Sequence, residues 1–244
     1  RRVEFIHAAL EELQLSLVKM GTSVEVFYST PSQAFSELIG KYKIEKVFTN
    51  HDYEPYARQR DTAIEKLLRE QGVTFHTYKD QVILEKDEVL KDDGKPYTVF
   101  TPYARKWKSV LTDFHLKSYS NRKYFSNFFR QPGRTVISLE EMGFSKAGLS
   151  FPGKEWKGQV IRNYKEQRDF PAIQGTSRLS VHLRFGSISI RQLAAEAGAL
   201  NETYLNELIW RDFYHMILWH FPHVVGRAFR PEYDAIQWRN NEKD

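Results

Sequence analysis

Apolar residues recur every three or four positions through residues 1–20, which predicts an amphipathic helix closed by Gly21. The same spacing returns in residues 30–43, which open with a Thr–Pro pair suited to a helix start, and in residues 54–72, which end at a glycine. Short strand-like runs separate these helices, at residues 23–29, 46–50 and 73–78. Alternating helices and strands predict an α/β layer with a parallel sheet over residues 1–115.

The texture of the chain changes over residues 116–155, where basic, aromatic, Gly and Pro residues mix without long periodicity. This mixture is typical of a connection between two domains. Ser138 and Glu141 have the spacing of a capping box and predict one short helix in it. The interleaved basic and aromatic side chains also suit single-stranded nucleic acid, and this alternative stays open.

No strand pattern follows residue 155, and the spacing predicts helices at residues 189–199 and 203–221. We therefore expect residues 156–244 to begin an all-helical domain. One face of the second helix carries side chains that a helix does not need for burial: Glu207, Trp210, Arg211 and Tyr214. They could form a solvated face with a Glu–Arg pair, but an exposed tryptophan favours a binding surface.

Composition bounds the possible functions. The 244 residues include 41% hydrophobic and 27% charged residues, as in ordinary globular proteins, and the net charge of +5 modestly favours an anionic partner. The chain has no cysteine, which excludes disulfides and cysteine-ligated metal sites within it. No apolar run approaches the length of a membrane span, and the start is not a signal peptide, so we expect no membrane partner and a cytoplasmic location.

The predicted sheet lacks the common nucleotide-binding motifs, since it has neither a GxGxxG after a strand nor a GxxxxGK[ST]. A ligand of this sheet is expected beyond the carboxyl ends of its strands, around residues 49–52 and after Tyr78. The favoured interpretation of Asn50 and Asp52 is an ordinary turn before a helix, with both as turn and cap residues. The later histidines have no HExxH spacing, and no metal site is predicted from His215, His220 and His223.

One run concentrates hydrogen-bond donors at the start of an apolar-periodic segment, at Gly175, Thr176, Ser177, Arg178, Leu179 and Ser180. A helix N-terminus offers free N–H groups and partial positive charge, so hydroxyls and a guanidinium placed there suit a phosphate or pyrophosphate. The alternative is an over-endowed helix cap, with Thr176 or Ser177 capping and Arg178 in water. Local chemistry leaves the two alternatives equal.

The run "GTSRLSVHLRFGSIS" (175–189) resembles the flavin-binding TSxLSPxLxxGxxS stretch of the DNA photolyase/cryptochrome family. "NELIWRDFYHMIL" (206–218) is similar to the RELxWREFY helix of that family, and "VFTPYARKWKSVL" (99–111) and "IQWRNN" (236–241) match further landmarks in the same order. The resemblance covers essentially the whole chain and looks closest to bacterial cyclobutane-pyrimidine-dimer photolyases. It implies an N-terminal α/β domain, a long connection and a helical FAD-binding domain.

Carried over by position, the resemblance implies which residues bind FAD: Tyr164, Thr176, Ser177, Arg178, Leu179, Ser180 and Tyr204. It also implies contacts with UV-damaged DNA from Arg168, Glu207, Trp210, Arg211 and Tyr214, with Glu207 and Trp210 against the lesion. The implied activity is a deoxyribodipyrimidine photo-lyase that splits a flipped dimer by light-driven electron transfer from reduced FAD. The resemblance leaves two alternatives, a cryptochrome-type photoreceptor and a non-catalytic DNA-binding module.

Some departures from the family pattern limit what the resemblance implies. The family's first strands and arginine-rich turn, and the helices that surround the flavin ring, have no counterpart, so we expect an internal fragment that is inactive alone and a monomer at full length. Folate-binding members carry an Asn–Glu pair where this chain has Tyr56 and Ala57, which leaves a second chromophore unassigned and a folate unsupported. Val181 replaces the motif's proline.

Overall fold

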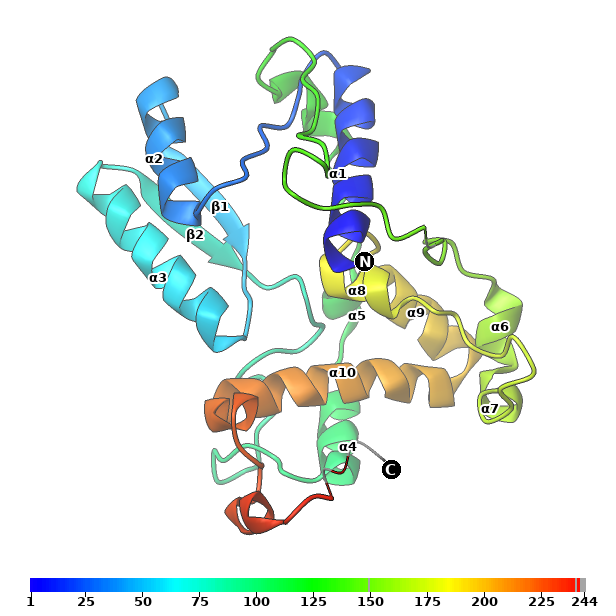
Figure 1. The fold of residues 1–244 in the computed structure, drawn as a ribbon. Helices are drawn as coiled ribbons and strands as arrows, with labels where there is room; N and C mark the ends of the chain where they lie inside the picture. Colours follow the sequence, from blue (N-terminus) through cyan, green and yellow to red (C-terminus); the bar gives the residue numbers. More distant parts are fainter. Residues whose placement is uncertain (149, 240, 242–244) are drawn as a thin grey trace.

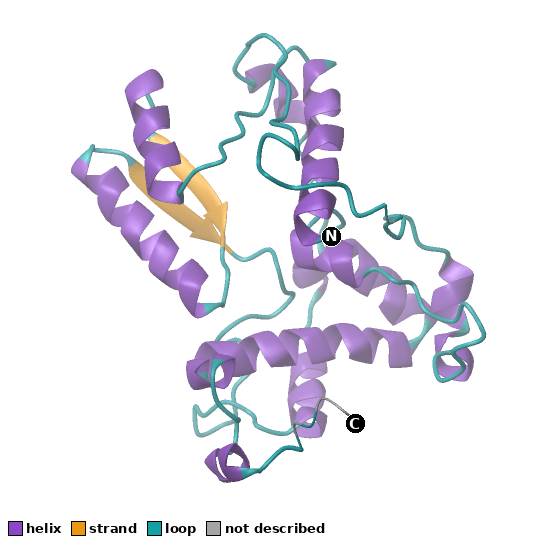
Figure 2. Ribbon diagram, in the orientation of Figure 1, coloured by secondary structure: helices purple, strands orange, loops and turns teal. Residues whose placement is uncertain are grey.

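The computed structural model describes residues 1–148, 150–239 and 241, and its N-terminal part contains the predicted α/β layer. Two helices cover one face of a two-stranded parallel sheet (Figures 1 and 2). The elements follow the predicted order: α2 (Pro31–Lys41), β1 (Lys46–Asn50), α3 (Pro55–Glu70) and β2 (Thr74–Tyr78). The strands pair in register from Lys46 opposite Thr74 to Asn50 opposite Tyr78. The mixed α/β fold class is thereby confirmed.

The ends of these helices have the chemistry that the sequence predicts. Thr30 caps α2 through a reciprocal capping box with Gln33, and Pro31 occupies the first helical position. At the end of α3, Gly72 adopts a left-handed φ of +72°, which permits the chain to turn into β2. Helix and strand are thus joined by a short turn, as a helical crossover requires.

The predicted strand at residues 23–29 is wrong, because this segment pairs with neither β1 nor β2. Its backbone is bonded instead by side chains from elsewhere. Gln14, on α1 (Arg2–Val18), accepts from Val24 N at 2.7 Å, and Gln131 donates to Ser23 O at 2.7 Å. The apolar residues at 23–29 therefore do not mark a strand. Side-chain amides bond the backbone of Ser23 and Val24 in place of a neighbouring strand.

The connection packs along α1, and Figure 1 shows it running beside that helix. Arg134 contacts Glu25 at 3.0 Å, and His7 bonds Ile137 O at 2.9 Å. The predicted capping box forms between Ser138 and Glu141, but residues 139–143 make a hydrogen-bonded turn in place of a helix. The connection thus binds the α/β side of the chain through polar contacts.

The remaining elements are helical, and none of the helices within the described ranges is long and apolar enough to cross a membrane. They are α4 (Phe100–Val110), α5 (Asp113–Leu116), η1 (Arg122–Asn127), α6 (Gly158–Arg162), α7 (Tyr164–Gln167), α8 (Ser180–Phe185), α9 (Ile190–Leu200), α10 (Glu202–His220), η2 (Pro222–Val225) and η3 (Pro231–Ala235). The expected helices at 189–199 and 203–221 correspond to α9 and α10. Residue 149, Asn240 of the landmark at 236–241, and residues 242–244 lie outside the described residues.

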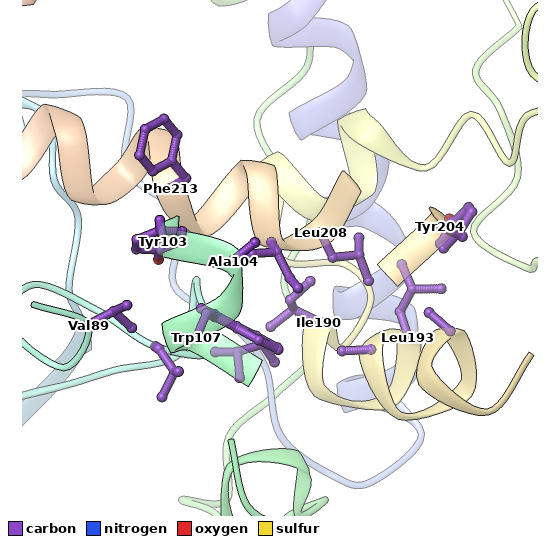
Figure 3. Packing of buried hydrophobic residues seen from close by; sticks show 14 of the residues in the cluster. Val89, Tyr103, Ala104, Trp107, Ile190, Leu193, Tyr204, Leu208 and Phe213 are labelled. Carbon is purple, nitrogen blue, oxygen red and sulfur yellow. The ribbon is translucent and has the colours of Figure 1, made fainter. Parts of the chain in front are cut away.

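The main hydrophobic cluster lies where α4, α9 and α10 meet (Figure 3). Trp107 of α4 is fully buried in the same cluster as Leu193 of α9 and Leu208 of α10. A separate smaller cluster joins α2 and α3 to the sheet around Leu68. Helix α4 belongs to the predicted α/β domain but packs in the helical core, so the proposed boundary near residue 115 follows the sequence pattern and does not separate the two cores.

One buried carboxylate links the two parts of the chain. Asp212 Oδ2, on α10, accepts from the backbone N–H groups of Ile83 and Leu84, each at 3.1 Å, and from Trp107 Nε1 at 3.0 Å. The side chain is 1% exposed, and Oδ1 has no partner among the described residues. Burial raises the pKa of Asp212 to about 6, although the three donated hydrogen bonds lower it.

Replacing Asp212 with asparagine tests the cost of this buried charge. The folded pKa of about 6 lies above the ordinary value of 3.8, so the unfolded chain releases the proton first and ionisation lowers stability as pH rises through this window. Because asparagine carries no charge, the free energy of unfolding of D212N relative to wild type should rise between pH 4 and pH 7, by up to roughly 3 kcal/mol.

Denaturant titrations at a series of pH values measure this difference. Asp92→Asn is the matched control, because the Asp92 side chain is 98% exposed, and it should show no such rise. A difference between D212N and wild type that stays constant with pH would contradict the ionisation of Asp212 in the core.

Candidate functional site

The donor-rich run lies tightly against α7 because residue 175 is glycine. A Cβ built on Gly175 would lie 2.7 Å from Gln167 O and 2.6 Å from Gln167 Cβ, closer than side chains tolerate. Gly175 is buried, while Thr176, Arg178 and Ser180 are exposed beyond it. The glycine thus brings the backbone of the run onto the end of α7 and leaves its polar side chains facing outward.

The structure rules out the capping interpretation of this run. Helix α8 begins at Ser180, so Leu179 occupies the N-cap position and no side chain caps the helix. The alternative in which Thr176 or Ser177 caps the helix is therefore wrong. Arg178 has a left-handed φ of +54°, an uncommon conformation for a residue with a side chain. The hydroxyls of Thr176 and Ser180 and the Arg178 guanidinium form an exposed donor set whose chemistry fits a pyrophosphate.

Two of the residues predicted to bind FAD are buried beneath this surface. Leu179 is 2% exposed and packs in the main hydrophobic cluster. Tyr204, at the start of α10, is 5% exposed, and its hydroxyl lies 2.7 Å from Ser177 Oγ. Burial raises the pKa of Tyr204. Both side chains support the run from below, and Tyr204 fixes the position of Ser177.

Tyr164 continues this support towards the residues predicted to bind DNA. Its ring packs edge-on against Tyr204, with the ring centroids 5.0 Å apart. The guanidinium of Arg168 lies over the Tyr164 ring at 5.4 Å from its centroid and forms an ion pair with Glu207 of α10. The carboxylate of Glu207 raises the pKa of Arg168, and burial raises that of Tyr164. The predicted cofactor-binding and DNA-binding residues therefore meet at the junction of α7 and α10.

Trp210 lies one turn beyond Glu207, in a stack of aromatic rings. Phe100 is parallel to the indole, with centroids 3.6 Å apart and 5° between the planes, and Tyr214 is stacked at 5.5 Å. Trp210 is consequently half-buried, so the prediction of an exposed tryptophan is wrong, whereas Tyr214 is 61% exposed. The stack holds the indole in one orientation, with Phe100 covering one of its faces.

Arg211 occupies a different place from the other residues of its predicted face. Its guanidinium donates to the backbone carbonyls of Gln81 and Leu183, the second at 3.2 Å. Burial lowers the pKa of Arg211. The side chain thus joins α10 to the segment after β2 and to α8, and its predicted contact with DNA stays a prediction.

A cleft of about 1470 Å³ opens beyond the carboxyl ends of β1 and β2, where the sequence places a ligand of the sheet. Segments from α8 to α9 and residues 114–121 form its other walls. Asp52, at its edge, accepts from the N–H groups of Tyr53 and Glu54, as expected for a turn residue. Within the described residues, no three His, Asp or Glu side chains are grouped to hold a metal ion.

Comparison with known proteins agrees with this architecture. The family profile described as DNA photolyase matches residues 1–120, and the one described as FAD binding domain of DNA photolyase matches residues 204–244. A deoxyribodipyrimidine photo-lyase of Alkalihalophilus pseudofirmus is 31% identical over 99% of this chain, which covers 54% of that protein. The chain therefore spans about half the length of the curated relatives it matches.

Solved structures give the same result for the fold. A bacterial class III photolyase from Agrobacterium tumefaciens superposes with a TM-score of 0.75 at 22% identity over 98% of this chain and 54% of that one. An archaeal photolyase from Sulfolobus tokodaii, described with two FAD molecules, superposes with a TM-score of 0.69 at 26% identity over 99% and 54%. The prediction of FAD as cofactor is confirmed, and the chain belongs to the photolyase/cryptochrome family.

Proposed function

We propose that this protein repairs cyclobutane pyrimidine dimers in DNA, by light-driven electron transfer from reduced FAD to a dimer flipped out of the duplex. The observation that carries the proposal is the contact chain from Ser177 through Tyr204 and Tyr164 to Arg168 and Glu207. In this proposal the contact chain joins the residues that bind the FAD pyrophosphate to the residues that bind DNA. Flipping is required because a stacked base inside a duplex cannot reach a cofactor held in the protein.

In this proposal the exposed hydroxyls of Thr176 and Ser180, with Arg178, bind the pyrophosphate of FAD. The Ser177 hydroxyl, which is held by the hydroxyl of Tyr204, is a further donor between Thr176 and Ser180. Bound FAD supplies the electron, and the protein positions the cofactor and the lesion. The structural role of this chain's residues is therefore to orient two ligands towards each other.

On the DNA side, Arg168 binds a phosphate near the lesion. Trp210 stacks on the flipped bases through the face of its indole that Phe100 does not cover. The Glu207 carboxylate accepts a hydrogen bond from a base N–H, and Tyr214 lines the rim of the same surface. A photoreceptor without repair activity does not require a base-stacking residue next to a paired carboxylate and arginine, which favours repair over signalling.

An absorption spectrum of the full-length protein, followed by illumination with a dimer-containing oligonucleotide, tests the proposal. We expect a flavin spectrum and light-dependent loss of the dimers. Flavin without dimer loss would favour a cryptochrome-type photoreceptor, and a protein that binds DNA without flavin would favour the non-catalytic binding module.

Trp210→Ala in the full-length protein should weaken binding to dimer-containing DNA by about 1–3 kcal/mol, because one base–aromatic stack is lost. The flavin content should change little, since the rings stacked on Trp210 are those of Phe100 and Tyr214, outside the donor-rich run. Fluorescence anisotropy with damaged and undamaged duplexes measures the effect. An affinity for damaged DNA that stays within twofold of wild type would identify Trp210 as a packing residue of the Phe100 stack.

Gly175→Ala should lower FAD binding. The added Cβ would overlap the backbone of Gln167, and relief of such crowding costs about 1–3 kcal/mol by shifting the run away from α7. We expect FAD affinity to fall by about tenfold, measured by titration of the deflavinated protein. Gly153→Ala is the control, because nothing lies within 4 Å of its Cβ position. Equal affinity in both variants would contradict the placement of the run.

A further inference from the structure

The ion pair between Arg168 and Glu207 joins two groups that the proposed function uses separately. Arg168 is the C-cap residue of α7, and Glu207 lies on α10, so the pair bridges two helices. Both side chains are partly exposed, at 36% and 38%, and neither is locked in the core. Each group is therefore accessible to DNA while the two form their ion pair.

We propose that this pair is a specificity device, in which Glu207 occupies Arg168 in the free protein and releases it when a flipped base is present. The inference rests on the proposed function and deepens it. It makes Glu207 a determinant of discrimination between damaged and undamaged DNA, in addition to its contact with the lesion.

The electrostatics of the pair disfavour undamaged DNA. Arg168 contacts two carboxylates, Glu207 and, at 3.5 Å, Asp169, so the three side chains together carry a net charge of −1. A phosphate that draws Arg168 away leaves Glu207 without its cation, next to a polyanion. An intact duplex offers phosphates, but the imide N–H groups of its bases are used in base pairing inside the stack and cannot replace the partner of Glu207.

A flipped pyrimidine changes this balance, because its imide N–H is a hydrogen-bond donor. Glu207 can accept from the base while Arg168 moves to the phosphate, so both groups exchange one partner for another. The Tyr164 ring, 5.4 Å from the guanidinium, limits the space through which Arg168 moves. An exposed ion pair is weak, so the device biases binding by about two- to fivefold and does not block it.

Glu207→Gln in the full-length, flavin-loaded protein separates this effect from simple charge removal. We expect E207Q to bind undamaged duplex about two- to fivefold more tightly than wild type, because Arg168 is released to phosphate. The preference for the same duplex containing one dimer should fall. Fluorescence anisotropy at several salt concentrations measures both affinities, and the salt dependence for undamaged DNA should steepen by about one unit.

Glu166→Gln is the matched control. Glu166 is an exposed residue of α7 close to Arg168 in sequence, and its change removes the same charge, whereas the ion-pair partners of Arg168 are Glu207 and Asp169. We expect E166Q to tighten binding to undamaged DNA less than E207Q does. In an Arg168→Ala background, the two substitutions should have equal effects, because no guanidinium is left to release.

Equal effects of E207Q and E166Q in the otherwise wild-type protein would overturn the inference, as would an advantage of E207Q that persists in the Arg168→Ala background. If E207Q loses flavin, Glu207→Asp provides the test, because it keeps the charge on a shorter side chain and loosens the pair. We expect this variant to bind undamaged DNA more tightly than the E166Q control does. Failure of the proposed function is distinct, because the wild-type protein would then show no preference for the dimer-containing duplex.

Discussion

The carboxylate of Asp212 is the contact on which the arrangement of this molecule depends. Asp212 is a buried residue of α10, and its carboxylate accepts hydrogen bonds from three N–H groups. Two belong to the segment after β2 and one to Trp107 of α4. A buried acceptor shared by three donors costs desolvation but leaves each donor satisfied, and removing it would orphan all three. The segment that leaves the sheet is thereby fixed to the helix that carries the candidate site.

The residue next to Asp212 on α10 adds further contacts between this helix and the rest of the chain. Arg211, next to Asp212, donates to the carbonyls of Gln81 and Leu183, so the same turn of helix also contacts the second half of α8. Glu207, one turn before Arg211, and Trp210 lie on the side of α10 away from Asp212. Because one rigid helix carries both sets, the distance between the donor-rich run and the proposed DNA surface is set by packing within the described part of the chain.

Local rules predicted much of the fold, and longer-range contacts account for what they missed. The Thr30 cap, the turn at Gly72 and the parallel pairing of β1 with β2 follow from residues close in sequence. The segment at 23–29 fails because side chains outside it bond its backbone, Gln14 from the preceding helix and Gln131 from a distant part of the chain. Asp212 was missed as well, although an acid four residues from both Leu208 and Met216, on the apolar face of the helix, was a signal of a buried acceptor.

For the candidate site as well, a motif predicts the types of residue, whereas their arrangement depends on packing. A motif gives the residue types of the run at 176–180, but only the fold shows that Leu179 and Tyr204 lie beneath it and that the hydroxyls do not cap α8. The same holds for Arg168 and Glu207, which are 39 residues apart and meet because α7 packs against α10. The run proposed to bind FAD is therefore an exposed set of donors that rests on buried side chains, and substitutions of those buried side chains should act through the position of the exposed groups.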